Sequence, residues 1–388
     1  MISCSVEVIV ALLLIARRRL TMRTIKSAIS LYWSGLLQSH FTMIPRFGVA
    51  VIGLVTVSLL NQTVLAQDIP QMNLSMGFFN NQRTETGLGE ADAYFAQEVA
   101  RLSGGRITVS LHPSGSLCAE TTCIQDVLQG SLDIGVASDS NYGPITTAFF
   151  VLGMPYIWKD QKAQDKILND WLGKQMGEAA ASAGLKVLFY IENDGFRNLW
   201  HNMDVDVRVP ADVPNIKLRT TNSPVELAID RAYGFQPVTV GSKEMFSALG
   251  QKVVRGMLNN NEWMIDGKYY EVVPRVTLIG VQIGYQPVTM RRESFEKLPS
   301  AAQKILLDAG YNTQLMHQQA MASIAGKGFD LLKQHRVKVY KPTDAELAQW
   351  TRIAPQVWAQ FAKEAPKDLI ERILREQGCP TTGCIPAV

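Results

Sequence analysis

Regular alternation of strand and helix patterns is the feature that most constrains this chain. Four short apolar segments with strand spacing are separated by three segments of helical spacing. The strand segments are residues 71–78, 107–111, 132–137 and 186–191, and the helical segments are 91–102, 124–130 and 162–183. A β-α-β-α-β order of this kind predicts a largely parallel sheet with helices on both faces.

The alternation restarts near residue 194 and predicts a second α/β unit. Its strands are expected at 216–219, 237–240 and 253–258, and its helices at 224–232 and 245–249. The apolar stretch 281–290 is long enough to run between the two units. A helix that begins at Ser300 and extends towards Gln334 is long enough to be shared by both. Two α/β units with several crossings predict a hinged clamp, with a ligand in the crevice at the carboxyl ends of the strands.

Residues 1–66 are predicted to be a targeting segment and are left out of the fold prediction. A short basic stretch ending at Arg46 precedes the apolar residues 47–60, and the small-x-small pattern that ends at Ala66 predicts cleavage before Gln67. The residues before Met43 fit such a segment less well, so we expect translation to start at Met43. The apolar stretch is shorter than the roughly 20 residues of a spanning helix, although an uncleaved anchor remains the alternative.

The charge of the remaining chain argues against a nucleic-acid-binding protein. The 388 residues carry a formal charge of +3, but residues 1–66 contain six of the 38 Lys and Arg and one of the 35 Asp and Glu. The body therefore has a net charge of −2 and no cluster of basic residues. A protein that binds DNA or RNA would present a basic surface.

The four cysteines outside the targeting segment are predicted to form disulfides, because export leads to an oxidising compartment. Four cysteines allow three pairings, of which the two short loops are the simplest. These loops join Cys118 to Cys123 and Cys379 to Cys384. A zinc site is the rival reading, but it would favour closer cysteine spacing or a nearby histidine, so we expect no metal.

The sequence lacks the residue patterns of the common catalytic sites. No G-x-S-x-G, Walker or H-E-x-x-H motif occurs, and the four histidines of the body have no metal-ligand spacing. The Gly87-Leu-Gly89 pair lacks the third glycine of a dinucleotide site. We therefore predict a protein that is not an enzyme and that carries no cofactor.

A few polar side chains at the ends of apolar strands are candidates for ligand binding. Arg219 ends the segment 216–219 and is followed by two threonines, an asparagine and a serine. A guanidinium that faces a crevice presents a planar pair of donors matched to a carboxylate. Arg197 lies where one unit should lead into the next, and Asn259 ends another apolar segment with Trp263 shortly after it. A solvated strand-end position remains the alternative for each arginine.

A set of modest motifs recurs in a characteristic order along the chain. They are GGRITVSLHPSGSL at 104–117, GSLDI at 130–134, LGMPY at 152–156, GFR at 195–197, IKLR at 216–219, and SAL at 247–249 leading through VVRG at 253–256 to Asn259. In this order and spacing, the chain from about 70 to 365 resembles the extracytoplasmic solute receptors of TRAP (tripartite ATP-independent periplasmic) transporters.

The resemblance implies roles for several residues. In that family an arginine of a K-x-R stretch forms a salt bridge with the ligand carboxylate, which implies this role for Arg219. The second arginine and the asparagine of the family match Arg197 and Asn259. Further positions implied to contact the ligand are Ser138, Asp139, Ser242, Thr86 and Gly87. Leu258 replaces the usual acid of the family, and with Trp200 and Trp263 it favours an aromatic or branched acid.

The resemblance also implies the architecture and the partners. We expect a two-lobed periplasmic-binding-protein clamp (type II-like), with a mostly parallel sheet flanked by helices in each lobe and a long helix bridging both. Lobe I is expected at 67–193 with a return at 285–322, and lobe II at 194–284 with 323–388 and the C-terminal helices. The implied function is that of a monomeric periplasmic receptor, which delivers a small organic acid to a sodium-driven membrane permease. A receptor that presents its ligand to a sensor kinase, and an exported enzyme on a bilobal scaffold, are the alternatives.

Overall fold

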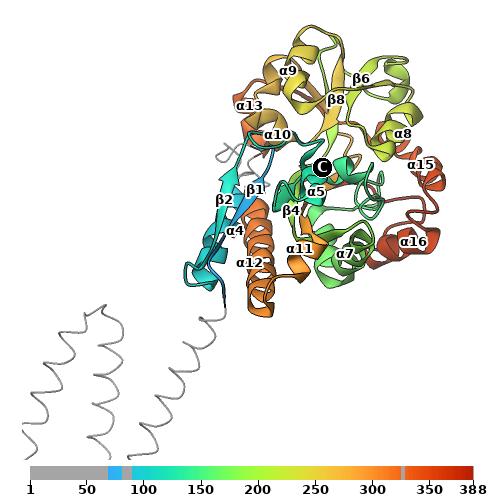
Figure 1. Ribbon diagram of the computed structural model, residues 1–388. Helices are drawn as coiled ribbons and strands as arrows, with labels where there is room; N and C mark the ends of the chain where they lie inside the picture. Colours follow the sequence, from blue (N-terminus) through green and yellow to red (C-terminus); the bar gives the residue numbers. More distant parts are fainter. Residues whose placement is uncertain (1–68, 81–89, 325–327, 388) are drawn as a thin grey trace, which may run out of the picture. The chain divides into compact units, whose positions relative to one another are not determined.

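The structure is a computed structural model that describes residues 69–80, 90–324 and 328–387 (Figure 1). The predicted targeting segment and the candidates Thr86 and Gly87 lie outside the described residues. Two sheets organise the described part, one of five strands in the order β2-β1-β3-β10-β4 and one of six in the order β11-β9-β5-β8-β6-β7. The predicted α/β fold with two units is therefore confirmed.

The five-stranded sheet contains the strands expected in the first half of the chain and one from the second half. Its strands are β1 (Met72–Gly77), β2 (Ile107–His112), β3 (Ile134–Val136), β4 (Leu185–Phe196) and β10 (Ile283–Arg291). Strand β1 runs parallel to β2 and β3, whereas β10 is antiparallel to both β3 and β4. The sheet is mixed because β10 enters it on the return from the other unit.

The six-stranded sheet contains three strands that periodicity did not predict. Its strands are β5 (Asn198–His201), β6 (Lys217–Thr220), β7 (Gln236–Thr239), β8 (Gly256–Asn259), β9 (Arg275–Thr277) and β11 (Lys338–Tyr340). Strand β6 is parallel to β7 and β8, and β5 is antiparallel to β8 and β9. The missed strands β5, β9 and β11 have three or four residues each, too few for an alternation to register.

Helices cover the five-stranded sheet and connect its strands. They are α4 (Glu90–Leu102), α5 (Cys123–Gln129), α6 (Gln161–Ile167), α7 (Gly173–Ala181), α11 (Arg292–Glu296) and α12 (Ser300–Ile324). Gly130 ends α5 with a φ of 81°, a left-handed conformation that glycine adopts without strain. A π-helical turn at Leu168–Leu172 joins α6 to α7, so the single helix predicted at 162–183 is present but irregular.

The remaining helices flank the six-stranded sheet or follow it. They are α8 (Pro224–Ala232), α9 (Ser242–Gly250), α10 (Asn261–Asp266), α13 (Gly328–Gln334), α14 (Asp344–Thr351), α15 (Ala354–Gln360) and α16 (Lys367–Glu376). Ser223 accepts a hydrogen bond from the backbone of Glu226 and Pro224 occupies the first turn, which together start α8. The helix expected to run from Ser300 to Gln334 is described as α12 and α13, which lie on either side of residues 325–327.

Two extended segments pass side by side from one sheet to the other. The backbone N–H of Arg197, between β4 and β5, donates to the carbonyl of Gln282 at 2.7 Å, and Val281 donates to the carbonyl of Arg197 at 3.0 Å. Val281 and Ile283 are fully buried at this crossing. A pair of hydrogen-bonded connections of this kind is a suitable place for a hinge, since small dihedral changes there rotate one sheet against the other.

Each sheet has an apolar core of its own, and a third, larger cluster contains buried residues of both sheets, among them Tyr285 of β10 and Leu218 of β6. Phe95 of α4 packs on Phe189 of β4, with ring centroids 4.8 Å apart, beneath α12. Trp200 of β5 and Met257 of β8 lie in the second core, where both are fully buried. Within the described residues, no helix has both the length and the apolar character that crossing a membrane requires.

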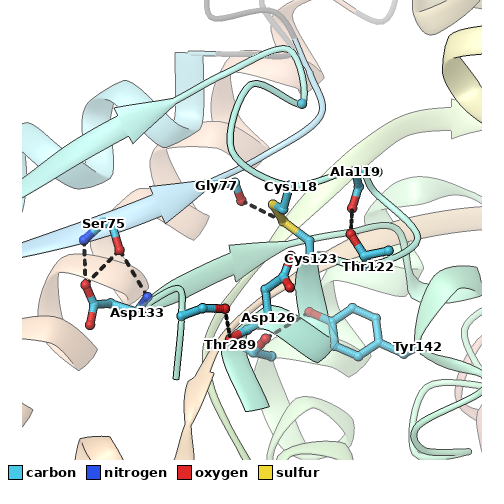
Figure 2. Close-up of a disulfide and its surroundings, with 12 residues drawn as sticks. Ser75, Gly77, Cys118, Ala119, Thr122, Cys123, Asp126, Asp133, Tyr142 and Thr289 are labelled. Atoms are coloured by element: carbon cyan, nitrogen blue, oxygen red, sulfur yellow. Dashed lines mark hydrogen bonds between the residues drawn. A yellow bond between two sulfur atoms is a disulfide. The ribbon is translucent and has the colours of Figure 1, made fainter. Parts of the chain in front are cut away.

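Both predicted disulfides are present, Cys118–Cys123 and Cys379–Cys384. Figure 2 shows the first, which packs against the end of β1: the Sγ atom of Cys123 lies 3.5 Å from the carbonyl oxygen of Gly77. A Cβ atom at Gly77 would lie only 2.7 Å from the Sγ atom of Cys118, so this position has no room for a side chain. The disulfide therefore fixes the loop 118–123 directly beside the sheet.

Candidate functional site

Six of the predicted ligand-binding residues line one small cavity. Arg219 and Asn259 come from the ends of the neighbouring strands β6 and β8, and Ser138 follows β3 of the other sheet. The cavity, called here the inner chamber, has a volume of about 30 Å³. Its lining is Phe79, Glu120, Ser138, Arg197, Arg219, Thr221, Ser242, Asn259, Asn260 and Trp263. The chamber thus lies at the carboxyl ends of strands from both sheets, where an α/β clamp is expected to bind its ligand.

Arg219 is the cation of the chamber that has no acidic partner among the described residues. Its Nε atom donates to the carbonyl of Val240 at 3.0 Å, which orients the guanidinium at the end of β6. No ion pair in the described part of the chain includes it. Burial lowers the pKa of Arg219, partly offset by the charges of Glu226 and Glu120, yet a guanidinium stays protonated at neutral pH. Its terminal nitrogens therefore remain available to an anion.

Arg197 lies in the same chamber but is already neutralised. Its Nη1 atom forms an ion pair with the Oε1 atom of Glu226, and both side chains are more than nine-tenths buried. The other carboxylate oxygen of Glu226 accepts hydrogen bonds from Thr221, at 3.2 Å from the backbone nitrogen and 2.6 Å from the hydroxyl. Burial alone would raise the pKa of Glu226, but the charge of Arg197 and the bonds from Thr221 hold it below the usual range.

Glu120 is a chamber residue that the sequence analysis did not select. Its Oε1 atom accepts hydrogen bonds from the Ser138 hydroxyl at 2.5 Å, from the Ser138 backbone at 3.3 Å and from Asn141 at 2.8 Å. Burial raises the pKa of Glu120, against the lowering effect of Ser138 and of the Arg219 charge. Its position between the paired cysteines Cys118 and Cys123 is the signal that could have identified it, because the disulfide holds it on a tight loop.

A second cavity, called here the outer chamber, adjoins the first and has a volume of about 190 Å³. The two chambers share Phe79, Glu120, Ser242 and Trp263. The outer chamber is also lined by Asn80, Ser114, Gly115, Ala119, Lys243, Asp266, Gly267 and Tyr269. The Trp263 and Tyr269 rings stack at 4.8 Å between centroids, which gives it an aromatic wall. The Nζ atom of Lys243 lies 3.5 Å from the carbonyl of Gly115, so α9 and the loop after β2 meet at this cavity.

Three of the expected contributions to the site, those of Asp139, Trp200 and Leu258, are not found in the lining of either chamber, and Leu258 instead packs against an apolar core. Asp139 lies in a separate small cavity behind it, where burial, against the charge of Arg197, raises its pKa to about 7. Trp200 was expected to add aromatic surface near the crevice, but it is fully buried in the core of the six-stranded sheet. Its position on β5, opposite Met257, points it into that core.

A larger cavity of about 680 Å³ lies elsewhere, between α6, α10 and the end of α12. Its lining contains Asp160, Asp165, Glu192 and Glu262 but a single cation, Lys162. Within the described residues, this lining has no arginine and four carboxyl groups against one lysine, so it offers an anion no unmatched cation, and the inner chamber is the better site for a carboxylate. In the described part of the chain, no group of three or more His, Cys, Asp or Glu is placed to hold a metal ion.

Two α/β units joined by paired crossings, with a polar chamber at the carboxyl ends of their strands, define a solute-binding receptor of the two-lobed class. The bacterial extracellular solute-binding proteins of family 7 (DctP) match residues 79–364, which is more than half of the chain. The chain belongs to this family, and the predicted resemblance is thereby confirmed. The family consists of receptors rather than enzymes, as expected from the missing catalytic motifs.

Individual relatives agree with this assignment. A solute-binding protein of Verminephrobacter eiseniae is 27% identical over 318 residues, which is 81% of this chain and 91% of the relative. The 2,3-diketo-L-gulonate-binding periplasmic protein YiaO of Escherichia coli is 24% identical over 273 residues, 69% of this chain and 82% of its own. The crystal structure of the sugar acid binding protein DctPAm of Advenella mimigardefordensis with galactonate matches with a TM-score of 0.74 at 26% identity, covering 80% of this chain and 99% of that one.

Proposed function

We propose that this protein is a periplasmic receptor that captures a small organic acid through an ion pair between Arg219 and the ligand carboxylate. The observation that carries the proposal is a cation in the inner chamber with no acidic partner among the described residues, beside the polar side chains of Asn259 and Ser138. A planar guanidinium can form two parallel hydrogen bonds with a carboxylate. Galactonate and 2,3-diketo-L-gulonate, the ligands named for two relatives, are both carboxylic acids.

The neutralised Arg197 has a supporting role in this proposal. With its charge matched by Glu226, it positions the wall of the chamber and offers its remaining N–H groups as donors. Its Nε atom is buried without a hydrogen-bond partner among the described residues, and a bound oxygen would satisfy it. Asn259 and Ser242 add neutral polar groups on the same side. Of the two arginines in the inner chamber, Arg219 is therefore the one that faces the ligand without an ion-pair partner among the described residues.

The affinity that such a receptor needs is within reach of these groups. A micromolar dissociation constant corresponds to about −8 kcal/mol. A charge-assisted hydrogen bond contributes about 1.5 to 3 kcal/mol and a neutral one about 1. One bidentate pair, a few neutral bonds and apolar burial against Phe79 and Trp263 together supply the required free energy.

Ligand capture is proposed to proceed by closure about the paired crossings at Arg197 and Val281–Gln282. The anion meets Arg219 first, and Ser138 and Glu120 of the other sheet then close over it. The Lys243–Gly115 contact joins the same two sides at the outer chamber, as a closed form requires.

The closed receptor then delivers its ligand to a sodium-driven TRAP permease, and residues 1–66 direct the protein to the periplasm. Cell fractionation of tagged protein, with and without residues 43–66, tests the localisation.

The decisive experiment is a thermal-shift screen of a carboxylic-acid library on the purified protein and on two variants. A ligand at 100 times its dissociation constant stabilises the folded state by about 2.7 kcal/mol, which gives a measurable shift. Arg219→Ala should abolish the shift, whereas Arg372→Ala, which removes a surface arginine of α16, should preserve it. Equal binding by wild type and Arg219→Ala would show that the anchor has been assigned to the wrong residue.

A further inference from the structure

Two opposite charges of the inner chamber are left unmatched once the buried ion pair is set aside. Arg197 and Glu226 neutralise each other, which leaves the guanidinium of Arg219 and the carboxylate of Glu120. These two side chains influence each other electrostatically, but no ion pair joins them. They come from different sheets, since Arg219 is on β6 and Glu120 is on the disulfide loop before α5.

Only one oxygen of Glu120 is used by the protein among the described residues. All three of its recorded hydrogen bonds, from Ser138 and Asn141, go to the Oε1 atom. Within residues 69–80, 90–324 and 328–387, the Oε2 atom has no hydrogen-bond partner, although Glu120 lines both chambers. A carboxylate oxygen accepts and does not donate, so the group that completes it must be a donor.

The size of the inner chamber limits which part of the ligand can reach Glu120 there. A water-sized probe needs roughly 10 to 15 Å³ of such volume, and the chamber offers about 30 Å³. The ligand carboxylate and one neighbouring substituent would fill it. The rest of the ligand then lies in the outer chamber of about 190 Å³. A donor that meets Glu120 inside the inner chamber is therefore on the carbon next to the carboxylate.

We propose that Glu120 is a specificity-determining residue that selects acids with a hydroxyl or ammonium group on the carbon next to the carboxylate. This inference rests on the proposed function, with the carboxylate held by Arg219. An acid without such a donor leaves the Oε2 atom of Glu120 desolvated and unpaired, which costs affinity. A second carboxylate on the same carbon faces Glu120 as a like charge and is rejected.

Two matched series of acids test the inference by isothermal titration calorimetry. The first has a phenyl body: 3-phenylpropionate, 3-phenyllactate, phenylalanine and benzylmalonate. The second has a polyol body: 2-deoxygluconate, gluconate and glucosaminate. Within a series, the acid with the donor should bind about 10- to 100-fold more tightly than the acid with hydrogen in its place, the range for a hydrogen bond to a charged group. Benzylmalonate should be the weakest of its series. Comparing the hydroxyl acid with the ammonium acid of the same series shows which of the two donors binds more tightly.

The variant Glu120→Gln separates this role from a structural one. Its amide oxygen can replace Oε1 and keep the bonds from Ser138 and Asn141, while its NH2 group presents a donor where Oε2 was an acceptor. The preference for the donor-bearing acid should fall to about threefold or less. The largest loss of affinity should be that of the ammonium compounds, phenylalanine and glucosaminate. Glu178→Gln, at an exposed position of α7, should leave every affinity unchanged. An unchanged melting temperature of the ligand-free variant verifies its fold.

The outcomes distinguish this inference from the proposed function. If acids with hydrogen in place of the donor bind as tightly as their partners, and Arg219→Ala abolishes binding, Glu120 has no selective role and the anchor assignment stands. Equal preference in wild type and Glu120→Gln also means that Glu120 has no selective role. If the donor-bearing acids of both series fail to bind while another carboxylic acid binds through Arg219, the selective role of Glu120 is likewise refuted. If Arg219→Ala binds like wild type, the proposed function itself is wrong.

Discussion

Arg197 and Glu226 form an ion pair at the base of the inner chamber, where both side chains are more than nine-tenths buried. The two residues are 29 positions apart; Arg197 lies at the crossing between the two sheets and Glu226 lies on α8. The ion pair therefore links the crossing between the two sheets to α8, the helix that follows β6 and Arg219. A closing movement about the crossing has to carry this pair as a unit, because separating it would leave two buried charges uncompensated.

Breaking this pair should be strongly destabilising. Glu226→Gln leaves the buried Arg197 without its counter-charge, and the free energy of unfolding should fall by about 3 to 5 kcal/mol. Urea unfolding followed by circular dichroism measures the change. The matched control is Glu296→Gln, which removes the partner of Arg292 in an exposed pair of α11 and should cost less than about 1 kcal/mol. Similar small losses in both variants would mean that the buried pair is not the structural element described here.

The two disulfides should differ in what they control. Each closes a loop with a sequence separation of 5, so removing either should cost about 2 kcal/mol by the chain-entropy model. The double variant Cys118→Ser/Cys123→Ser also frees the loop that carries Glu120 and should weaken ligand affinity. The variant Cys379→Ser/Cys384→Ser should lose stability with unchanged affinity, since that disulfide lies outside both chambers. Thermal unfolding and titration calorimetry on the two variants test the contrast.

Gly310 is required by the close approach of α12 to β4. A Cβ atom there would lie 2.9 Å from the carbonyl oxygen of Leu188 and 2.9 Å from the Phe189 ring, so Gly310→Ala should force the helix away from the sheet. The expected cost is about 1 to 3 kcal/mol. Gly177→Ala in α7 is the matched control, because its Cβ atom would find its nearest neighbour at 4.0 Å. That variant should be unchanged or more stable by up to about 1 kcal/mol. A harmless Gly310→Ala would contradict the packing described.

Asp92 should make the stability depend on pH. It is fully buried in the first turn of α4, neither carboxylate oxygen has a hydrogen-bond partner among the described residues, and burial raises its pKa to about 8. A folded-state pKa above the unfolded value means that its contribution is fully present below about pH 4 and is lost as the pH rises towards 8.

Asp92→Asn should therefore stabilise the protein by about 1 to 3 kcal/mol at pH 8 and by little at pH 4. Urea unfolding of wild type and variant at pH 4, 6 and 8 measures the difference. Glu90→Gln, at an exposed position of the same helical turn, serves as the control. A difference between Asp92→Asn and wild type that does not grow with pH would show that folding does not raise the pKa of Asp92.

Much of the fold could be predicted because its periodic segments are long. Residues 91–102 have helical spacing and form α4, and the alternation at 71–78 forms β1. The antiparallel arrangement of β10 could not be predicted in this way, because the direction of a returning strand depends on where the intervening chain enters the sheet. Strand β5 has four residues and is buried on both faces, so it shows no alternation.

The site was predicted to a similar extent. The strand-end position of Arg219 and the resemblance together indicated the residues that meet in the inner chamber, although their contacts with a ligand remain predictions. Glu120 was missed because a single acid in a short loop is typical of solvent-exposed positions. The charge state of Arg197 was missed as well, because its partner Glu226 becomes a neighbour only when α8 packs against the crossing. Such tertiary pairings leave no local pattern in the sequence.

The ring closed by Cys118 and Cys123 contains Glu120 itself, so the proposed selection of ligands by Glu120 would depend on the oxidation of these cysteines. A chain kept in a reducing compartment would have its guanidinium anchor in place, since no cysteine supports β6. The loop that carries Glu120 would then lack its disulfide, and the Glu120 side chain would be less firmly positioned opposite Arg219. Recombinant protein from a reducing cytoplasm should therefore still bind carboxylic acids, but with a reduced preference for those that have a donor next to the carboxylate. Reoxidation of the two cysteines should restore the preference.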